Sequence, residues 1–472
     1  MDPQPPNTAQ KALSINLDAS RYGTFAEIGA GQEVARWFFL VGGAAGTVAK
    51  TISAYDMTVS DAVYGPVKRY VSRDRLQAML DHEWRLLLER LDQRRGDTTA
   101  FFVLADTVAT KSYTHQEDGH GWLGIRFQAV PRAQPSDIII HARMWDADNA
   151  RQQEALGILG VNLIHSAVAL EAQPEKLIGS LMDDLTRDRM EVDMIKFSGP
   201  AFTGVDNRLM SLQLVRQRLT NAALFDPDGE VIEPAELLYN QPVLIERGSF
   251  RPVTNVTLDM LDRSLGQMRR EPDMSGREPV ALMEMTLRNL SNLEEEIEHA
   301  DFLARVAMLG ALGKTVMVSN YSRFHNVTGY LRRYTHERVG MVLGVPTLVQ
   351  VFEEGHYTDL EGGLLEALGR LFKGPVKLYI YPWKQKRTGE IVTADTFRLP
   401  AHLRHLYAHL LDNHLVESIR EFSDAGLSAL PREVAALIRQ GDPRWQSMVP
   451  PKVVKIIQER ELFGHRSEGR ES

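Results

Sequence analysis

The chain has 472 residues, of which 43% are hydrophobic and 25% charged, and its formal net charge is −8. These values are typical of a packed globular protein, and the length predicts about two to four domains. The negative charge argues against nucleic acid as a partner. The absence of cysteine excludes disulfides, thiolate metal ligands and cysteine nucleophiles.

The N-terminus and the most apolar stretch of the chain bear on its location. Residues 1–11, MDPQPPNTAQK, contain no basic region and no apolar core, so we expect no signal peptide. The longest uncharged apolar stretch runs from Trp37 to Ala49 and falls well short of the about 20 residues that span a bilayer. We therefore expect no membrane partner and a cytoplasmic location.

The first half of the chain predicts a mixed α/β domain over residues 11–235, after a disordered tail at residues 1–10 that contains three prolines. Residues 226–229, Asp-Pro-Asp-Gly, predict a hairpin turn. The clearest predicted elements are, in chain order, strand Leu13–Leu17, helices Glu27–Leu40, Ala44–Ile52 and Asp74–Leu91, and strands Ala100–Ala105, Trp122–Phe127 and Asp137–Met144.

Two groups of polar residues in this half have the side chains of a metal site. His115, Asp118 and His120 could bind a hard or borderline metal, and Asp146, Asp148 and Asn149 could bind magnesium. Glycines flank the first group, and acidic residues that follow a strand usually cap the next helix. We therefore expect a polar loop and a helix cap, with no metal site. A metal-dependent enzyme that uses these loops remains the alternative.

Two glycine turns in this half superficially resemble dinucleotide-binding loops. Neither Gly29–Gly31 nor Gly42–Gly46 follows a convincing apolar strand. We expect the first to begin a helix and the second to join two helices.

The second half alternates more regularly between short apolar strands and helices. This alternation predicts a parallel sheet covered on both faces, in a Rossmann-like domain over residues 236–398. The best helix runs from Asn292 to Leu312, with Ser291 as its cap and Glu294 three residues on. Residues 399–472 predict a helical segment that ends in a mobile tail. The predicted strands are Val243–Glu246, Val280–Met285, Thr315–Ser319, Val339–Leu343 and Val376–Tyr381.

One motif comes closest to naming a chemistry. Residues 248–261, GSFRPVTNVTLDML, follow the first strand of this predicted sheet and lead into a helix. Phosphates bind at such strand–turn–helix junctions, through backbone amides and the helix N-terminus. The segment resembles the ATP-binding signature of nicotinamide/nicotinate mononucleotide adenylyltransferases. Gly248, Ser249, Phe250, Pro252 and Thr254 match that signature.

The chain departs from the signature at two positions. Arg251 stands at its Asn/Asp position, and Thr257, which is shorter and never cationic, stands at its last histidine. The nearest counterpart of the family's second signature, Ser-Ser/Thr-x-x-Arg, is Ser319–Arg323.

The resemblance implies roles for individual residues. Gly248, Ser249, Phe250 and Arg247 would bind a nucleotide, with ATP and Mg²⁺ as the cofactors. Thr254, Thr257 and Arg251 would act on the transferred group, the threonines as hydrogen-bond donors and the arginine as a stabilising charge. The fold implied is a Rossmann-like domain of the nucleotidyltransferase type.

Nearly the whole chain is similar to a group of bacterial proteins that carry two conflicting names, nicotinate-nucleotide adenylyltransferase and TonB-dependent receptor. The segments that carry this similarity are SINLDASRYGTFAEIGAGQEVARWFF, AKTISAYDM, VDNRLMSLQLV and LEGGLLEALGRLF. The receptor name conflicts with the few alternating ten-residue strands in this sequence.

Two main hypotheses follow. The first is a nucleotide-binding protein that transfers an adenylyl group from ATP to a mononucleotide. The second is a catalytically degenerate scaffold, or homo-oligomeric assembly protein, that keeps the fold. The missing histidine and the poor second signature favour the second hypothesis.

Overall fold

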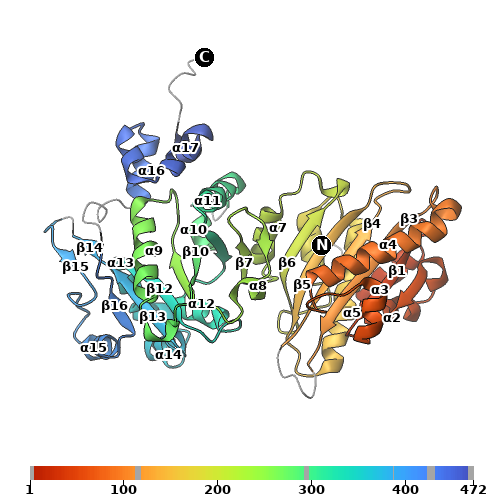
Figure 1. Ribbon diagram of the computed structural model, residues 1–472, viewed down its shortest axis with the longest axis horizontal. Helices are drawn as coiled ribbons and strands as arrows, with labels where there is room; N and C mark the ends of the chain where they lie inside the picture. The colour runs from red at the N-terminus through yellow and green to blue at the C-terminus, as the bar shows by residue number, and fades with distance from the viewer. Residues whose placement is uncertain (1–4, 112–117, 292–296, 386, 423–430, 466–472) are drawn as a thin grey trace, which may run out of the picture. The chain divides into compact units, whose positions relative to one another are not determined.

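The computed structural model describes residues 5–111, 118–291, 297–385, 387–422 and 431–465. The chain forms two compact units, Met1–Asn221 and Ala222–Ser472, and both are α/β (Figure 1). The sequence places the boundary at residue 235, whereas residues 222–225 and 231–232 form strands of the second unit's sheet. These strands, and the predicted hairpin turn between them, therefore belong to the second unit.

The first unit contains a six-stranded sheet with the order β2-β1-β3-β4-β5-β6. Strands β2, β1 and β3 are parallel to one another, and β4, β5 and β6 continue the sheet antiparallel. The strands are β1 (Arg21–Ile28), β2 (Val48–Ile52), β3 (Ala100–Ala109), β4 (Gly119–Phe127), β5 (Ser136–Met144) and β6 (Met190–Ser198).

Helices cover both faces of this sheet. A Cβ at Gly124 of β4 would meet Leu76 and Leu80 of helix α4, while the neighbouring Leu123 and Ile125 belong to the core cluster on the α5 side. Because strand side chains alternate, α4 and α5 lie on opposite faces. The helices are α1 (Thr8–Asn16), α2 (Glu33–Leu40), α3 (Met57–Tyr64), α4 (Arg73–Arg95), α5 (Asn149–Ala169), α6 (Pro174–Ser180) and α7 (Asn207–Arg216), with 3-10 turns η1 (Ala44–Gly46) and η2 (Pro200–Phe202).

Three predicted elements of the first unit are wrong. Leu13–Leu17, predicted as a strand, lies at the end of α1, and α1 begins inside the predicted tail because Asn7 forms a capping box there. Ala44–Ile52, predicted as a helix, forms η1 and β2. Glu27–Leu40, also predicted as a helix, contains the end of β1, a turn and α2.

The second unit contains an eight-stranded sheet with the order β16-β13-β12-β9-β10-β11-β7-β8. The six neighbouring strands from β16 to β11 are parallel, and numbered in chain order they have the 3-2-1-4-5-6 arrangement of a Rossmann-like, doubly wound sheet. The strands are β7 (Ala222–Phe225), β8 (Val231–Ile232), β9 (Val243–Arg247), β10 (Val280–Thr286), β11 (Thr315–Ser319), β12 (Val339–Gly344), β13 (Val376–Tyr381) and β16 (Val416–Ser418), and β14 (Trp383–Lys384) pairs with β15 (Ile391–Val392) in a separate ribbon.

The helices of the second unit connect these strands and extend beyond them. Strand β16 lies inside the predicted helical segment, and α11 begins at His299 rather than at Asn292. Glu294 of the predicted capping box and residues 466–472 of the predicted tail lie outside the described residues. The helices are α8 (Pro234–Leu238), α9 (Asn255–Met268), α10 (Leu287–Leu290), α11 (His299–Ala311), α12 (Phe324–Leu331), α13 (Val345–Val351), α14 (Gly363–Leu371), α15 (Arg404–Asp412), α16 (Pro431–Arg439) and α17 (Pro451–Glu459), with 3-10 turns η3 (Pro272–Met274), η4 (Glu354–Tyr357), η6 (Pro443–Met448) and η7 (Leu462–Gly464).

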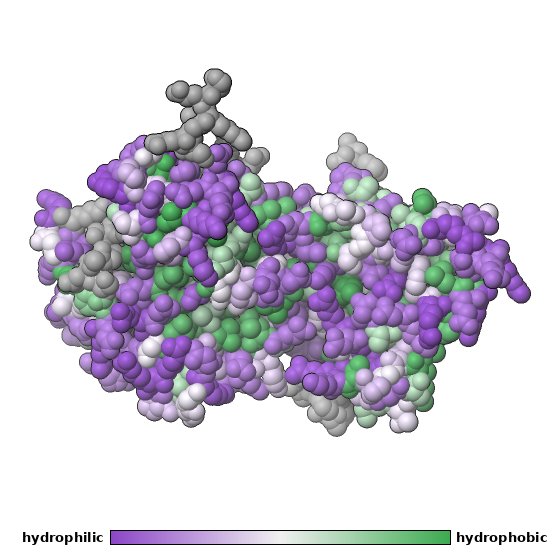
Figure 2. Space-filling model, turned by 45° about the horizontal axis from the view of Figure 1, so that its top comes forward, coloured by the Kyte–Doolittle hydropathy of each residue, from purple (hydrophilic) through white to green (hydrophobic). Residues whose placement is uncertain are grey.

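The surface agrees with the ordinary composition of the chain. Figure 2 shows hydrophilic residues over most of the visible face. Within the described residues, no helix combines the length and apolarity needed to cross a bilayer.

Candidate functional site: an arginine-lined pocket beside the Gly248 turn

The Gly248 turn lies where doubly wound sheets bind ligands. Strand β9 sits in the middle of the sheet, between β10 and β12, and the turn leaves its carboxyl end. The strand order reverses between β9 and β12, and crevices for ligands form at such a reversal. The predicted strand–turn–helix order is therefore confirmed, with α9 beginning at Asn255.

The turn itself is held by hydrogen bonds to neighbouring segments. The amide of Gly248 donates to the carbonyl of Glu284 at 3.0 Å, and the side chain of Asn289 donates to the carbonyl of Gly248 at 3.3 Å. Phe250 is buried, with a positive φ of 47° that few non-glycine residues adopt. Its ring packs against Gly248, where a Cβ would come within 2.7 Å of it. Gly248 and Phe250 thus set the shape of the turn.

The two threonines of the motif point into the start of α9. Thr254 is the N-cap, and its hydroxyl accepts a hydrogen bond from the amide of Thr257 at 3.3 Å. The hydroxyls of the two residues lie 3.1 Å apart, and both side chains are buried. Thr254 therefore satisfies a backbone donor of the helix N-terminus, Thr257 bonds to Thr254, and neither threonine lines the pocket described below.

Replacing Thr254 with alanine separates this capping role from phosphate binding. We expect Thr254→Ala to lower the free energy of unfolding by about 1 kcal/mol, measured by urea denaturation, because an N-cap acceptor is lost. Thr254→Ser should restore it. If Thr254 caps only, the affinity for ATP in calorimetry stays unchanged. A matching loss of ATP affinity would instead support the donor role that the adenylyltransferase resemblance implies.

Arg247 is bound within the fold. Its guanidinium forms two hydrogen bonds of 2.9 Å with the buried carboxylate of Glu284, and it donates to the carbonyl of Ser322 at 3.2 Å. The ring of Phe324 lies 4.6 Å from its guanidinium carbon, and the hydroxyl of Ser319 donates to Glu284 at 2.6 Å. Arg247 thus ties β9 to β10 and to the segment that follows β11.

Arg251 belongs to a chain of charges on the other side of the turn. Its Nε lies 2.9 Å from a carboxylate oxygen of Asp301 on α11, and Asp301 also pairs with the buried Arg305. Arg305 donates to the carbonyls of Ser249 at 3.1 Å and Asn289 at 2.8 Å. Burial lowers the pKa of Arg305, and the Asp301 carboxylate partly offsets this effect. The first two turns of α11 thereby fix the outer part of the Gly248 turn.

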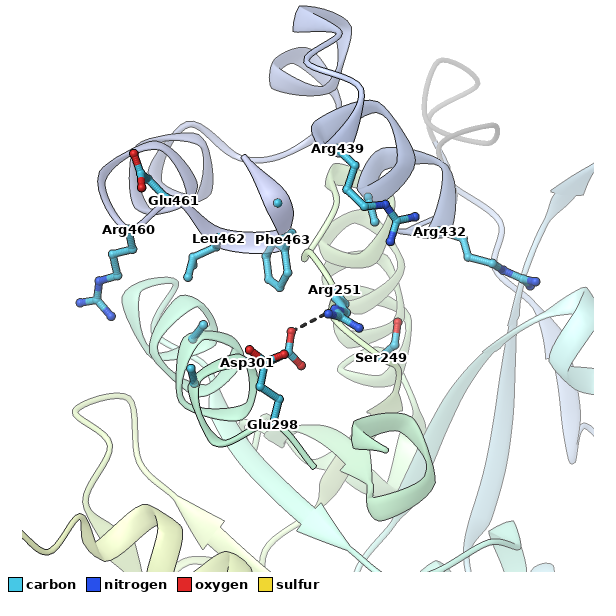
Figure 3. Close-up of a pocket in the computed structure, with 14 residues that line it drawn as sticks. Ser249, Arg251, Glu298, Asp301, Arg432, Arg439, Arg460, Glu461, Leu462 and Phe463 are labelled. Atoms are coloured by element: carbon cyan, nitrogen blue, oxygen red, sulfur yellow. Dashed lines mark ion pairs between the residues drawn. The ribbon is translucent and has the colours of Figure 1, made fainter. Parts of the chain in front are cut away.

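A pocket of ≈ 560 Å³ opens beside this charge chain. Its volume falls within the range of small-molecule sites. The turn and α11 form one side, and α16 and the segment Arg460–Gly464, which follows α17 and contains η7, form the other (Figure 3). The lining residues are Ser249, Arg251, Glu298, Ala300, Asp301, Ala304, Arg432, Ala435, Arg439, Arg460, Glu461, Leu462, Phe463 and Gly464.

Four arginines line the pocket, and only Arg251 came from the sequence motif. Figure 3 shows Arg439 and the ring of Phe463 directed toward Arg251 and Asp301, while Arg432 and Arg460 extend to the two sides. Of these four arginines, Arg251 alone forms an ion pair with a described residue.

Sequence reasoning missed the three C-terminal arginines because each lies on an exposed helix surface, where arginine is ordinary. A weak signal was the unusual spacing of arginines in α16, at positions 432 and 439, two turns apart on one face. Arg323, the last residue of the second-signature candidate, pairs with Asp359 at 2.6 Å and does not line this pocket.

The polar groups of the first unit are mostly engaged in local contacts. Asp146 pairs with Arg189 at 2.8 Å, and Asp148 caps α5. Asp118 lies 3.4 Å from the amine of Lys111, and His115 lies outside the described residues. The cap predicted for Asp148 is therefore confirmed.

His120 joins a different group. Its Nδ1 lies 3.2 Å from Nε2 of His141, whose Nδ1 lies 2.6 Å from the carboxylate of Asp193. Burial lowers the pKa of His120 to about 4, so this imidazole is neutral at neutral pH.

No protein-family model and no curated protein matches the sequence. Solved structures of the CinA superfamily match part of the fold. A competence/damage inducible protein from Agrobacterium tumefaciens is 15% identical, covers 35% of this chain and 97% of its own, and has a TM-score of 0.25. A CinA superfamily protein from Enterobacter cloacae is 12% identical, and the match covers 35% of this chain and 95% of that protein, with a TM-score of 0.26. One from Klebsiella pneumoniae is 14% identical, and the match covers 35% of this chain and 99% of that protein, also with a TM-score of 0.26. This structural relation is weak and partial.

Proposed function

We propose that the second unit binds a nucleotide in the pocket beside the Gly248 turn. The observation that carries the proposal is the set of arginines there, Arg251, Arg432, Arg439 and Arg460, next to the carboxyl end of the first strand of a Rossmann-like sheet. Guanidinium groups bind phosphate through paired, charge-assisted hydrogen bonds. The pocket therefore suits a small ligand with more than one phosphate.

The charges in the pocket are arranged to leave cationic groups for a ligand. Asp301 is directed at Arg251 and Arg305, and so offsets charge at the base of the pocket. Arg439 extends from the opposite wall toward the same place, without an ion pair to any residue that the structure describes (Figure 3). A phosphate between Arg251 and Arg439 would bind both guanidinium groups, with the hydroxyl of Ser249 on the same side.

The reaction implied by the adenylyltransferase resemblance is the transfer of an adenylyl group from ATP to a mononucleotide. An oxygen of the acceptor phosphate would attack the α-phosphorus, the bond between the α- and β-phosphates would break, and pyrophosphate would leave with Mg²⁺. Arg251 and Arg439 would stabilise the charge on the phosphates, and Glu298 supplies an exposed carboxylate near them.

One observation favours binding without catalysis. The hydroxyls of Thr254 and Thr257 and the guanidinium of Arg247 are all engaged inside the fold. The motif therefore supplies the turn but offers few free groups for the transferred phosphate. A nucleotide-binding scaffold, which is homo-oligomeric in the second hypothesis, is accordingly the second candidate function.

Replacing Arg439 tests the proposed site. In calorimetric titrations with ATP, we expect Arg439→Ala to weaken binding about 10- to 100-fold, because one charge-assisted contact to phosphate is lost. Arg288→Ala is the matched control, since Arg288 is an exposed arginine of the same unit that does not line the pocket, and its affinity should equal that of the unmodified protein.

Thermal unfolding with and without nucleotide gives a second measurement. ATP at about a hundred times its Kd should stabilise the protein by about 2.7 kcal/mol. The proposal is wrong if ATP, AMP and pyrophosphate all leave the unfolding temperature unchanged, or if Arg439→Ala and Arg288→Ala bind ATP equally well. Formation of a dinucleotide and pyrophosphate from ATP and a mononucleotide would select the transferase over the scaffold.

A further inference from the structure

The short segment Glu461–Gly464 has an unusual backbone at the edge of the pocket. Glu461, Phe463 and Gly464 have positive φ angles of 49°, 56° and 84°. Positive φ is unfavourable for a bulky residue such as phenylalanine, and residues with such backbone angles concentrate at ligand sites. The conformation places Leu462 and Phe463 in the pocket wall, instead of continuing α17.

Phe463 is placed to contact a ligand. Its side chain is half-buried, and its ring is directed into the pocket toward Asp301 and Arg251 (Figure 3). It is the aromatic residue among those that line the pocket. The part of the ring that protein leaves uncovered faces the pocket and is available to a planar partner.

The walls of the pocket differ in chemistry. The pocket is lined by apolar residues as well as by the arginines, namely Leu462, Phe463, Ala300, Ala304 and Ala435. A ligand made only of phosphate would contact the arginines and leave this apolar surface exposed to water. A ligand with a planar ring and a phosphate chain would cover both kinds of surface.

We infer that Phe463 is a stacking platform for the base of a nucleotide whose phosphates bind Arg251 and Arg439. This inference rests on the proposed function and specifies which part of the ligand each wall contacts. Stacking on an aromatic ring tolerates any base, because every base has a π-face. Selection between bases would then depend on residues other than Phe463, and the pocket would distinguish nucleotides from inorganic polyphosphates.

The test compares two probes on the full chain: ATP, which has a base, and inorganic triphosphate, which does not. We expect the unmodified protein to bind ATP more tightly. Phe463→Leu should weaken ATP binding about 5- to 100-fold, since it keeps an apolar side chain but removes the ring. Phe463→Tyr should retain the ATP affinity, and neither variant should change the affinity for triphosphate.

The outcomes distinguish this inference from the proposed function. If triphosphate binds as tightly as ATP, or if Phe463→Leu leaves the ATP affinity unchanged, the stacking role is wrong, while an anion site at the arginines stands. If Phe463→Leu weakens both probes equally, the residue shapes the pocket without stacking on a base, which also overturns the inference. If neither probe binds the unmodified protein, the proposed function itself fails.

Discussion

Arg305→Met should lower the free energy of unfolding of the second unit by about 3–5 kcal/mol. The side chain of Arg305 is 1% exposed, and it pairs with Asp301 while donating to the carbonyls of Ser249 and Asn289. Methionine fills a similar volume but donates no hydrogen bond. Two carbonyls and part of a carboxylate would then be left without their partner in a buried place.

Urea denaturation followed by fluorescence measures this effect, since Trp383 and Trp445 report on the second unit and the remaining tryptophans lie in the first. Arg288→Met, at an exposed position, is the control and should cost less than about 0.5 kcal/mol. A loss below about 1 kcal/mol for Arg305→Met would show that water or a rearranged Arg251 replaces its contacts.

Arg305→Met should also change the arrangement of residues that line the pocket. Arg305 fixes the carbonyl of Ser249 and the carboxylate of Asp301, and both residues line the pocket. Without it, Arg251 would be the one ion-pair partner left to Asp301 among the described residues, and Arg251 would be less available to phosphate. Arg305 is thus a positioning residue for the proposed site.

The fold of the second unit was largely predictable because its buried strands are short apolar runs between helices. The Gly248 turn follows such a run, Val243–Glu246, so its place in the sheet could be inferred before its contacts were known. The pocket could not be inferred in the same way. Its arginines at 432, 439 and 460 lie about 180 to 210 residues from Arg251 in sequence, and only the packing of the C-terminal helices brings them to the turn.

The first unit was harder to predict because charged residues interrupt its buried strands. Strand β1 contains Arg21 and Glu27, so the sequence shows no apolar run before Gly29–Gly31. The turn is therefore predicted to begin a helix. In the structure this turn joins β1 to α2. Gly29 packs so closely against β3 that a Cβ would come within 1.9 Å of the carbonyl of Val108. The glycine is required for packing, which no local pattern reveals.

The buried Glu27 has a partner of like charge. In the parallel register of β1 and β3, Glu27 lies directly beside Asp106, and their side chains are 1% and 0% exposed. Glu27 accepts hydrogen bonds from the amides of Val34 and Ala35 at the start of α2. Neither carboxylate oxygen of Asp106 has a hydrogen-bond partner among the described residues. Two ionised carboxyl groups that are buried side by side would repel each other strongly.

Burial, reinforced by nearby acidic residues, raises both pKa values. The pKa of Glu27 rises from 4.5 to about 7. The pKa of Asp106 rises well above 3.8, and the nearby amide of Ile28 offsets only part of this rise. The folded state therefore binds protons that the unfolded chain releases. The stability that these protons contribute is fully present when the pH is below the pKa values of the two groups in the unfolded chain. It is lost as the pH rises through their pKa values in the folded protein. For Glu27 alone, the shift corresponds to about 3 kcal/mol.

We therefore expect Asp106→Asn to become favourable as the pH rises. The amide has nearly the shape of the carboxylic acid but never ionises, so the substitution removes one buried charge and relieves the pKa of Glu27. The free energy of unfolding of the variant, minus that of the unmodified protein, should increase between pH 5 and pH 8, by up to about 1.4 kcal/mol per pH unit for each proton that the fold retains. Urea denaturation across this range measures the difference. The contribution of His120 is the same in both proteins and cancels from this difference.

Asp188→Asn is the matched control, because Asp188 is an exposed aspartate of the same unit, and its difference from the unmodified protein should stay within about 0.5 kcal/mol at every pH. A flat difference for Asp106→Asn as well would mean that Asp106 ionises without penalty, which requires a cation or water beside it. A decreasing difference would mean that the ionised carboxylate stabilises the fold. An increase confined to Asp106→Asn would establish that the buried carboxyl pair of β1 and β3 holds at least one proton at neutral pH.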